Sequence, residues 1–189
     1  MPFIKTKFPG LWVFEPNVIN DSRGYFFESY SEKTCKESGI DTTFIQDNQA
    51  KSVYGVVRGL HYQKDPFAQT KFIRALQGSI LDVVVDIRRG SPTFGEHFSI
   101  ELSAENKKQL YIPRGFAHGY SVLSETAEVF YKCDAFYNKA AEGGIQYFDP
   151  ALNIDWRIPE DQRISSDKDL NYPVFAACDN NFVFNQSVL

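Results

Sequence analysis

The sequence has few of the features that build membrane spans, disulfide frameworks and metal centres. Its longest aliphatic runs are of the size of Val83-Val84-Val85, which is too short to cross a bilayer, and the N-terminal stretch MPFIKTKFPG lacks the apolar core of a signal peptide. The three cysteines, Cys35, Cys133 and Cys178, are odd in number and match no zinc or disulfide spacing. We therefore expect a cytoplasmic protein with buried, reduced thiols and no membrane association.

An excess of basic residues is also missing. The 20 Lys and Arg are outnumbered by 24 Asp and Glu, which gives a formal net charge of −4. Nucleic acids are bound mainly by clustered Lys and Arg side chains that neutralise phosphates. This balance argues against a nucleic-acid partner, and any anionic ligand has to meet a local basic site.

Aromatic residues and turn formers are plentiful. The 17 Phe and 10 Tyr are interspersed with 12 Gly and 9 Pro, which is typical of many short strands joined by turns. A chain of 189 residues suits one buried core, so we predict a single all-β domain over 1–189, a sandwich or barrel with 174–189 as a packed C-terminal extension. Strands are expected at 11–14, 25–30, 43–50, 55–63, 97–102, 108–112, 119–124 and 127–136.

Local patterns add detail to this plan. A short helix is expected over 31–38, where Ser31 can cap the first turn and Gly39 can end the helix. From about residue 138 onward, Gly, Pro and polar residues break the periodicity. We expect these later segments to lie over the surface of the barrel.

The clearest alternation of apolar and polar residues runs over 71–87. It predicts a hairpin in which Asp82 and Asp86 lie on the face opposite the aliphatic residues. A second antiparallel pair is expected between 58–63 and 70–76, across the short loop KDPFAQ. That pairing would bring polar side chains of both strands into one cavity.

The stretch RGLHYQ places an arginine, a histidine and a glutamine in a strand-forming run. Its plain interpretation is an edge strand facing water. If the strand instead lines a barrel, His61 and Lys71 can share a cavity, and Arg58 points inward with His61 only if a bulge forms at Gly59.

The segment PRGFAHG has the spacing P-x-G-x-x-H, which resembles the second motif of cupin jelly rolls. In metal-binding cupins the first motif supplies an H-x-H pair and a carboxylate, because a divalent ion requires three or four converging ligands. The corresponding stretch here is His61-Tyr62-Gln63, and the remaining histidine besides His118 is His97. We therefore expect no catalytic metal.

A resemblance to a known family covers nearly the whole chain. The segments similar to dTDP-4-dehydrorhamnose 3,5-epimerases are DSRGYFFESY, FIQDNQAKS, VVRGLHYQ, QTKFIRALQGSILDVVVDIRRGSPTFG, LSAENKKQLYIPRGFAHGYSVLSE, VFYKCDAFYN, EGGIQYFDPALNIDW and ISSDKD. The resemblance implies a cupin-type jelly roll (double-stranded β-helix) with short peripheral helices, a homodimer, and no metal or cofactor. It also implies inversion of carbons 3 and 5 of dTDP-4-dehydro-6-deoxy-D-glucose to give dTDP-4-dehydro-L-rhamnose.

The resemblance assigns catalytic roles to four matching residues. His61 matches the base and Asp169, in SDKD, matches the carboxylate that pairs with the base. Lys71 matches the cation for the enolate oxygen, and Tyr131 matches the acid. The chemistry fits, because a hydrogen beside a ketone leaves its charge on the carbonyl oxygen, and inversion then needs a proton on the opposite face.

Further matches imply contacts with the substrate. The residues concerned are Arg23, Glu28, Gln46, Asn48, Arg58, His118, Tyr137, Glu142 and Lys168. The guanidinium groups suit the diphosphate. Tyr137 matches a ring that stacks on thymine.

Three alternatives remain open from the sequence. A relative that inverts only carbon 3 or carbon 5, or one that acts on a differently substituted 4-keto sugar, would carry the same catalytic residues. A second alternative is a non-catalytic cupin that only binds a nucleotide sugar. The presence of both a base and an acid counts against it, because binding requires neither. A metal-dependent cupin would need ligands beyond the histidines that the chain offers.

Overall fold

The computed structural model describes residues 2–185, and almost all regular structure within them is β-strand. The strands are β1 (Phe3–Lys5), β2 (Trp12–Phe14), β3 (Ile19–Asp21), β4 (Gly24–Phe26), β5 (Gln46–Val53), β6 (Val57–Gln63), β7 (Lys71–Gln77), β8 (Ser79–Asp86), β9 (His97–Ser103), β10 (Gln109–Ile112), β11 (Phe116–Val122), β12 (Thr126–Cys133) and β13 (Glu142–Gly144). The short helices are α1 (Glu32–Glu37), α2 (Asp167–Leu170), and the 3-10 turns η1 (Lys139–Ala141), η2 (Glu160–Gln162) and η3 (Phe175–Ala177). Within the described residues, no helix combines the length and apolar character needed to cross a membrane.

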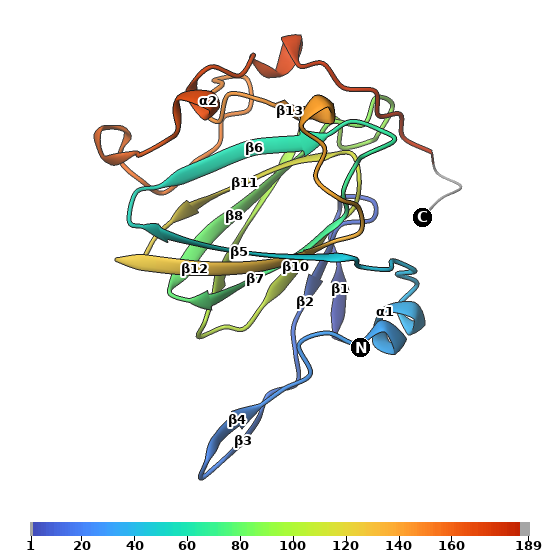
Figure 1. Ribbon diagram of the computed structural model, residues 1–189, viewed down its shortest axis with the longest axis vertical. Coiled ribbons are helices and arrows are strands. Elements are labelled where there is room, and N and C mark those ends of the chain that lie inside the picture. Colours follow the sequence, from blue (N-terminus) through green and yellow to red (C-terminus); the bar gives the residue numbers. More distant parts are fainter. Residues whose placement is uncertain (1, 186–189) are drawn as a thin grey trace.

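Two antiparallel sheets face each other and form the body of the molecule (Figure 1). The larger sheet has the strand order β1-β2-β10-β7-β12-β5, and the smaller has the order β13-β6-β11-β8-β9. Strands β3 and β4 make a separate hairpin that projects away from this body (Figure 1). The expected all-β jelly roll is thus confirmed, with short helices at its periphery.

Every strand expected from the sequence overlaps an observed one, and the expected helix is present. The Ser31 hydroxyl accepts a hydrogen bond from the Thr34 backbone N–H at 3.3 Å and caps α1, and Gly39 follows the helix with φ of +84°. The strands that the sequence did not indicate are β1, β3 and β13, each of three residues. Segments this short show no alternation pattern.

The predicted strand pairings are wrong in two places. Strands β7 and β8 do not form a hairpin, because the chain passes from the larger sheet to the smaller one at Gly78. Gly78 has φ of +68°, and a Cβ there would lie 2.1 Å from the Thr126 carbonyl oxygen, so this crossing requires glycine. Strand β6 likewise pairs with β11 and β13 and not with β7. Alternation identifies the buried face of a strand but not its neighbour.

The carboxylates of β8 are buried. Asp82 and Asp86 lie on the face opposite Leu81, Val83 and Val85, as the alternation predicts, and both are fully buried. The reason is that β8 is covered on both faces. Its inward residues pack between the sheets, and its outward residues lie beneath the C-terminal segments.

The core has two main layers. Apolar side chains between the sheets include Ile73, Ile80 and Leu110. A second cluster on the outer face of the smaller sheet includes Trp156, which is fully buried and donates its indole N–H to the Tyr147 carbonyl at 2.7 Å. The chain after β13 therefore lies over the smaller sheet, as predicted, and fixes the position of the segment that carries α2 (Figure 1).

Strand β6 contains the bulge expected at Gly59. His61 lies opposite His118 and Arg58 opposite Tyr120, so β6 advances one residue more than β11 between these pairs. Gly59 has φ of +118°, and a Cβ there would lie 2.6 Å from the Cα of Gly119. Only glycine permits this close approach, and its effect is to turn Arg58 and His61 toward the same space.

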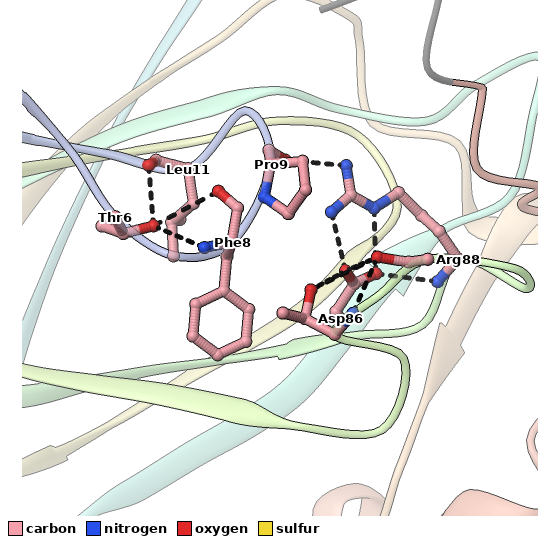
Figure 2. A network of polar contacts seen from close by, with 8 residues as sticks. Thr6, Phe8, Pro9, Leu11, Asp86 and Arg88 are labelled. Atoms are coloured by element: carbon pink, nitrogen blue, oxygen red, sulfur yellow. Dashed lines mark hydrogen bonds and ion pairs between the residues drawn. The ribbon is translucent and has the colours of Figure 1, made fainter.

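A buried ion pair fixes the β1–β2 turn to the end of β8 (Figure 2). Asp86 accepts hydrogen bonds from the Arg88 guanidinium at 2.9 and 2.7 Å, and from the hydroxyls of Ser91 at 2.6 Å and Thr93 at 2.7 Å. Arg88 also donates to the Pro9 carbonyl at 2.9 Å. Burial acts to raise the pKa of Asp86, but these donors together hold it below its ordinary value.

The C-terminal segment packs on the barrel as far as it is described, and residues 186–189 of the expected extension lie outside the described part. Phe182 is buried in the outer cluster. Asp179 binds Lys64 at 2.6 Å, and Asn181 exchanges two hydrogen bonds with the backbone of Asp65. This segment therefore braces the β6–β7 connection. The thiols of the chain are free, and Cys178 is partly exposed where a buried thiol was expected.

Candidate active site

A cavity of about 520 Å³ lies between the two sheets and is completed by the segment that carries α2. Residues of both sheets contribute to its wall. The predicted site residues that line it are His61, Lys71, Tyr131, Asp169, Arg58, His118 and Lys168. All four residues assigned to catalysis by the resemblance are thus brought together from four separate elements.

His61 and Asp169 form a hydrogen-bonded pair. The Nε2 atom of His61 lies 2.5 Å from Oδ1 of Asp169, and the Asp169 side chain is only 5% exposed. Ser166 caps α2 by accepting from the Asp169 backbone N–H at 3.2 Å, which fixes the carboxylate beneath the imidazole. Burial acts to raise the pKa of Asp169, but His61 and the Ser166 and Gly59 donors hold it below its ordinary value. The pair fixes the imidazole and leaves Nδ1 free to take a proton.

Lys71 enters the cavity from the first position of β7. Its backbone pairs with Ile112 and Cys133 in the larger sheet. Burial lowers the pKa of the Lys71 ammonium, while electrostatic interaction with Cys133, Asp82 and Glu142 acts in the opposite direction. A cation in a partly dry cavity stabilises an oxyanion more strongly than a cation in water does.

Tyr131 lies on β12, in the sheet that faces His61. Burial raises the pKa of its phenol, and Arg58 acts in the opposite direction to a smaller extent. The hydroxyl therefore stays protonated at neutral pH and is able to donate a proton. Arg58 itself is oriented by a hydrogen bond from its Nε to the Ser52 hydroxyl at 3.1 Å.

His118 is buried beside His61 and bound to a carboxylate of its own. Its Nε2 atom lies 2.9 Å from Oδ2 of Asp82, which is fully buried in β8. Burial lowers the pKa of His118, and Asp82 acts in the opposite direction. The cavity thus has two neighbouring histidine–aspartate pairs.

A chain of hydrogen bonds follows the rim of the cavity. The Tyr137 hydroxyl donates to Oε2 of Glu142 at 3.0 Å, and the Lys168 ammonium donates to Oε1 of the same carboxylate. Lys168 precedes Asp169 on α2. The rim residues assigned to substrate binding are therefore connected to the helix that holds the partner of His61.

Six predicted substrate-binding residues do not line this cavity: Tyr137 and Glu142, which reach it only through Lys168, and four others. Gln46 and Asn48 lie on β5, where the Gln46 amide donates to the Asn48 side-chain oxygen at 3.0 Å. Arg23 is in the turn of the β3–β4 hairpin, its side chain is 88% exposed, and it is paired with Asp21. Glu28 follows the same hairpin and accepts from the Thr34 hydroxyl at 3.3 Å.

Sequence reasoning missed Asp82 and Tyr120. Asp82 is fully buried as the partner of His118, and an aspartate inside the apolar run ILDVVV is itself a signal for a buried, paired carboxylate. Tyr120 lines the cavity, and nothing in the local sequence distinguishes it from a core tyrosine. Among the described residues, no three His, Cys, Asp or Glu side chains are grouped so that they could hold a metal ion.

Comparison with known proteins bears directly on this site. The sequence model described as dTDP-4-dehydrorhamnose 3,5-epimerase matches residues 5–177. The enzyme of that name from Shigella flexneri is 49% identical over 180 residues, covering 95% of this chain and 98% of its own.

Two solved structures share the fold closely. The dTDP-4-dehydrorhamnose 3,5-epimerase of Elizabethkingia anophelis is 52% identical, with a TM-score of 0.89 over 92% of this chain and 96% of that one. A dTDP-6-deoxy-D-glucose-3,5-epimerase of Legionella pneumophila, solved with dTDP-4-keto-L-rhamnose, is 42% identical, with a TM-score of 0.88 over 99% of this chain and 96% of that one. Because sequence and backbone agree over nearly the full length of each partner, the chain belongs to the dTDP-4-dehydrorhamnose 3,5-epimerase family of isomerases.

Proposed function

We propose that this protein inverts carbons 3 and 5 of dTDP-4-dehydro-6-deoxy-D-glucose and releases dTDP-4-dehydro-L-rhamnose. The observation that carries the proposal is the position of His61 and Tyr131, which line one cavity from different sheets. A base and an acid on opposite walls are what inversion through an enolate requires. Family membership supports the choice of substrate.

In the proposed reaction His61 removes the hydrogen beside the ketone. Asp169 accepts the Nε2–H of the imidazole, which keeps Nδ1 as the proton acceptor and stabilises the imidazolium that forms. The C–H electron pair moves into the ring, and the carbonyl oxygen becomes an enolate oxygen. Lys71 binds this oxygen, where a fixed ammonium lowers the energy of the developing charge.

Tyr131 then donates its phenolic proton to the carbon from the opposite wall. The raised pKa of its hydroxyl keeps this proton in place until the enolate, which is more basic, accepts it. The same sequence serves both carbons, because each flanks the carbonyl. Reorientation of the sugar ring between the two steps brings each carbon in turn to His61.

The substrate's nucleotide is proposed to lie along the rim. Arg58 and His118 line the cavity where sugar and phosphate oxygens would sit, and Tyr137 offers an exposed ring for the thymine. Gln46, Asn48, Glu142 and Lys168 are proposed as hydrogen-bonding residues for the same ligand. No metal or other cofactor has a step in this reaction.

We further propose that the working form is a homodimer. Every residue of β3 and β4 is exposed, including the apolar Ile19, Tyr25 and Phe26, and the hairpin stands clear of the barrel (Figure 1). Such an apolar strand pair is a hazard unless another chain covers it. A second copy would cover the hairpin and bring Arg23 and Glu28 to the partner's cavity.

Mixed subunits test this arrangement. Arg23→Ala and His61→Ala proteins should each be impaired alone. After unfolding and refolding together, random re-pairing should restore about a quarter of the unmodified activity if Arg23 acts in the partner's cavity. No recovery, or a monomeric mass by light scattering at micromolar concentration, would contradict the proposal.

The chain is proposed to act as one domain over 1–189 and to work in the cytoplasm. The three thiols are unpaired, as expected of a protein in a reducing compartment. The tail from residue 174 is proposed as part of this domain, because Asp179 and Asn181 bind the β6–β7 loop.

Proton NMR of dTDP-4-dehydro-6-deoxy-D-glucose in heavy water tests the activity. The expected result is deuterium at carbons 3 and 5 and the signals of the inverted sugar. Inversion at one carbon alone would assign the protein to the single-centre epimerases. Binding without exchange at either carbon would show a nucleotide-sugar-binding protein and overturn the proposal.

A further inference from the structure

Asp82 is a carboxylate buried without full compensation. It lies on β8, in the smaller sheet, with no exposed surface. Its Oδ2 atom binds His118, but its Oδ1 atom has no hydrogen-bond partner within the part of the chain described. A buried carboxylate oxygen left without a donor is costly, so it is retained only where another group offsets its charge.

Lys71 provides that opposite charge. Lys71 lines the cavity together with His118, which Asp82 binds at 2.9 Å, and Asp82 opposes the effect of burial on the pKa of Lys71. The titratable groups that face Lys71 come from every surrounding element. They are Arg58 and His61 of β6, Asp82 of β8, His118 and Tyr120 of β11, Tyr131 and Cys133 of β12, Glu142 of β13, and Lys168 and Asp169 of α2.

Among the carboxylates of this set, Asp82 is the one with a buried oxygen that has no hydrogen-bond partner within the described residues. Burial raises the pKa of the Cys133 thiol, so this thiol is uncharged at neutral pH. Glu142 is bound to Lys168, and Asp169 is bound to His61. The Oδ1 atom of Asp82 takes part in neither the Glu142–Lys168 pair nor the Asp169–His61 pair.

Asp82 also determines which nitrogen of His118 carries a proton. A carboxylate only accepts hydrogen bonds, so the Nε2 atom at 2.9 Å must be the donor. Burial lowers the pKa of His118 and favours the neutral ring. A neutral imidazole with its proton on Nε2 presents Nδ1 as an acceptor. His118 is then suited to accept a hydrogen bond from a sugar hydroxyl.

We propose that Asp82 is a positioning residue, which holds His118 as the neutral Nε2–H tautomer and keeps Lys71 charged for the enolate oxygen. The inference deepens the proposed epimerase function and rests on it for its catalytic consequence. Asp82 has no exposed surface and does not line the cavity, so it is not placed to contact the substrate. It acts through two residues on different sheets.

The test combines NMR titration with kinetics. In unmodified protein, the ring ¹⁵N shifts of His118 should report the Nε2–H tautomer. In Asp82→Asn, which keeps the size of the side chain, Lys71 should lose its proton at lower pH than in unmodified protein. The ¹³Cε signal of Lys71 measures this titration, and its absence from the spectrum of Lys71→Met identifies the signal. The alkaline limb of kcat should shift to lower pH as well, with kcat reduced about tenfold and KM changed less.

Asp41→Asn is the matched control, because it removes one exposed carboxylate that lies beside Lys36. It should leave the Lys71 titration and the pH profile unchanged. An unshifted Lys71 titration in Asp82→Asn, or an Nδ1–H tautomer of His118 in unmodified protein, would overturn the inference. The tautomer measurement needs no variant, so it decides the matter even if Asp82→Asn folds poorly. Absence of epimerisation in unmodified protein would refute the proposed function. The His118 tautomer and the Lys71 titration would still decide the role of Asp82.

Discussion

His61 and Tyr131 line the same cavity from two different sheets. His61 belongs to β6 of the smaller sheet and Tyr131 to β12 of the larger one. In the proposed reaction, a sugar ring bound between them has a proton acceptor on one side and a proton donor on the other. This arrangement separates proton removal from proton delivery, and variants of each residue should show the separation.

Replacement of His61 by alanine should abolish solvent exchange at both carbons, because one base serves both sites. General-base removal costs about 10² to 10⁴ in rate. Deuterium incorporation at carbons 3 and 5 measures it. His97→Ala is the control, since this partly exposed histidine of β9 does not line the cavity and its loss should leave the rate unchanged. Persistent exchange at either carbon would reveal a second base.

Tyr131→Phe should uncouple exchange from inversion. The ring still fills its space, so the free energy of unfolding should change little, but the donated proton is gone. His61 can then remove a hydrogen, exchange it with solvent and return it to the same face. In heavy water, deuterium should enter recovered starting sugar much faster than inverted product forms. Tyr54→Phe is the control, because this exposed tyrosine does not line the cavity. An equal fall in both rates would assign Tyr131 to packing or substrate positioning.

Lys71→Met should slow enolate formation while keeping the length and apolar stem of the side chain. Loss of one oxyanion-stabilising group costs about 10² to 10³ in kcat. The matched control is Lys51→Met, which replaces an exposed lysine of β5 and should leave kcat unchanged. If KM rises and kcat is unchanged, Lys71 binds substrate and does not stabilise the enolate.

Exhaustive chelation should leave activity intact. The Nε2 atoms of His61 and His118 are each engaged by an aspartate, so the two histidines lack the free, converging geometry that a divalent ion requires. Activity before and after dialysis against chelator gives the answer. Loss of activity that one added divalent metal restores would contradict the prediction.

Asp86→Asn should destabilise the fold without altering the cavity. It leaves the buried Arg88 guanidinium without its counter-charge, at a cost of about 3 to 5 kcal/mol in the free energy of unfolding. The folded-state pKa of Asp86 is lowered, so its contribution to the free energy of unfolding is present at neutral pH. This contribution is lost as the pH falls below the ordinary aspartate pKa of about 3.9. In urea unfolding, the difference in the free energy of unfolding between variant and unmodified protein should thus become smaller on acidification. A difference that does not depend on pH would exclude this ion pair as the cause.

Local features of the fold followed from the sequence by itself. Ser31 and Gly39 mark the ends of α1, because a hydroxyl that caps a first turn and a glycine with positive φ act on neighbouring backbone. The bulge at Gly59 was predictable for a similar reason, since Arg58 and His61 cannot share a face of a regular strand.

Tertiary structure alone decided which strands are neighbours and which charges are buried. The alternation in β7 and β8 fits a hairpin and a crossing between sheets equally well, and the crossing is selected by packing at Gly78 against Thr126, far along the chain. The sequence places Asp82 and Asp86 opposite the aliphatic residues of β8 but does not show that this face is buried, because their compensating partners, His118 and the Arg88 cluster, are known only once the strands are paired. The same holds for His61 and Asp169, 108 residues apart, whose pairing depends on the segment after β13 folding back over the smaller sheet. A carboxylate's environment is a property of the packed fold, since burial and charge partners come from elements distant in sequence.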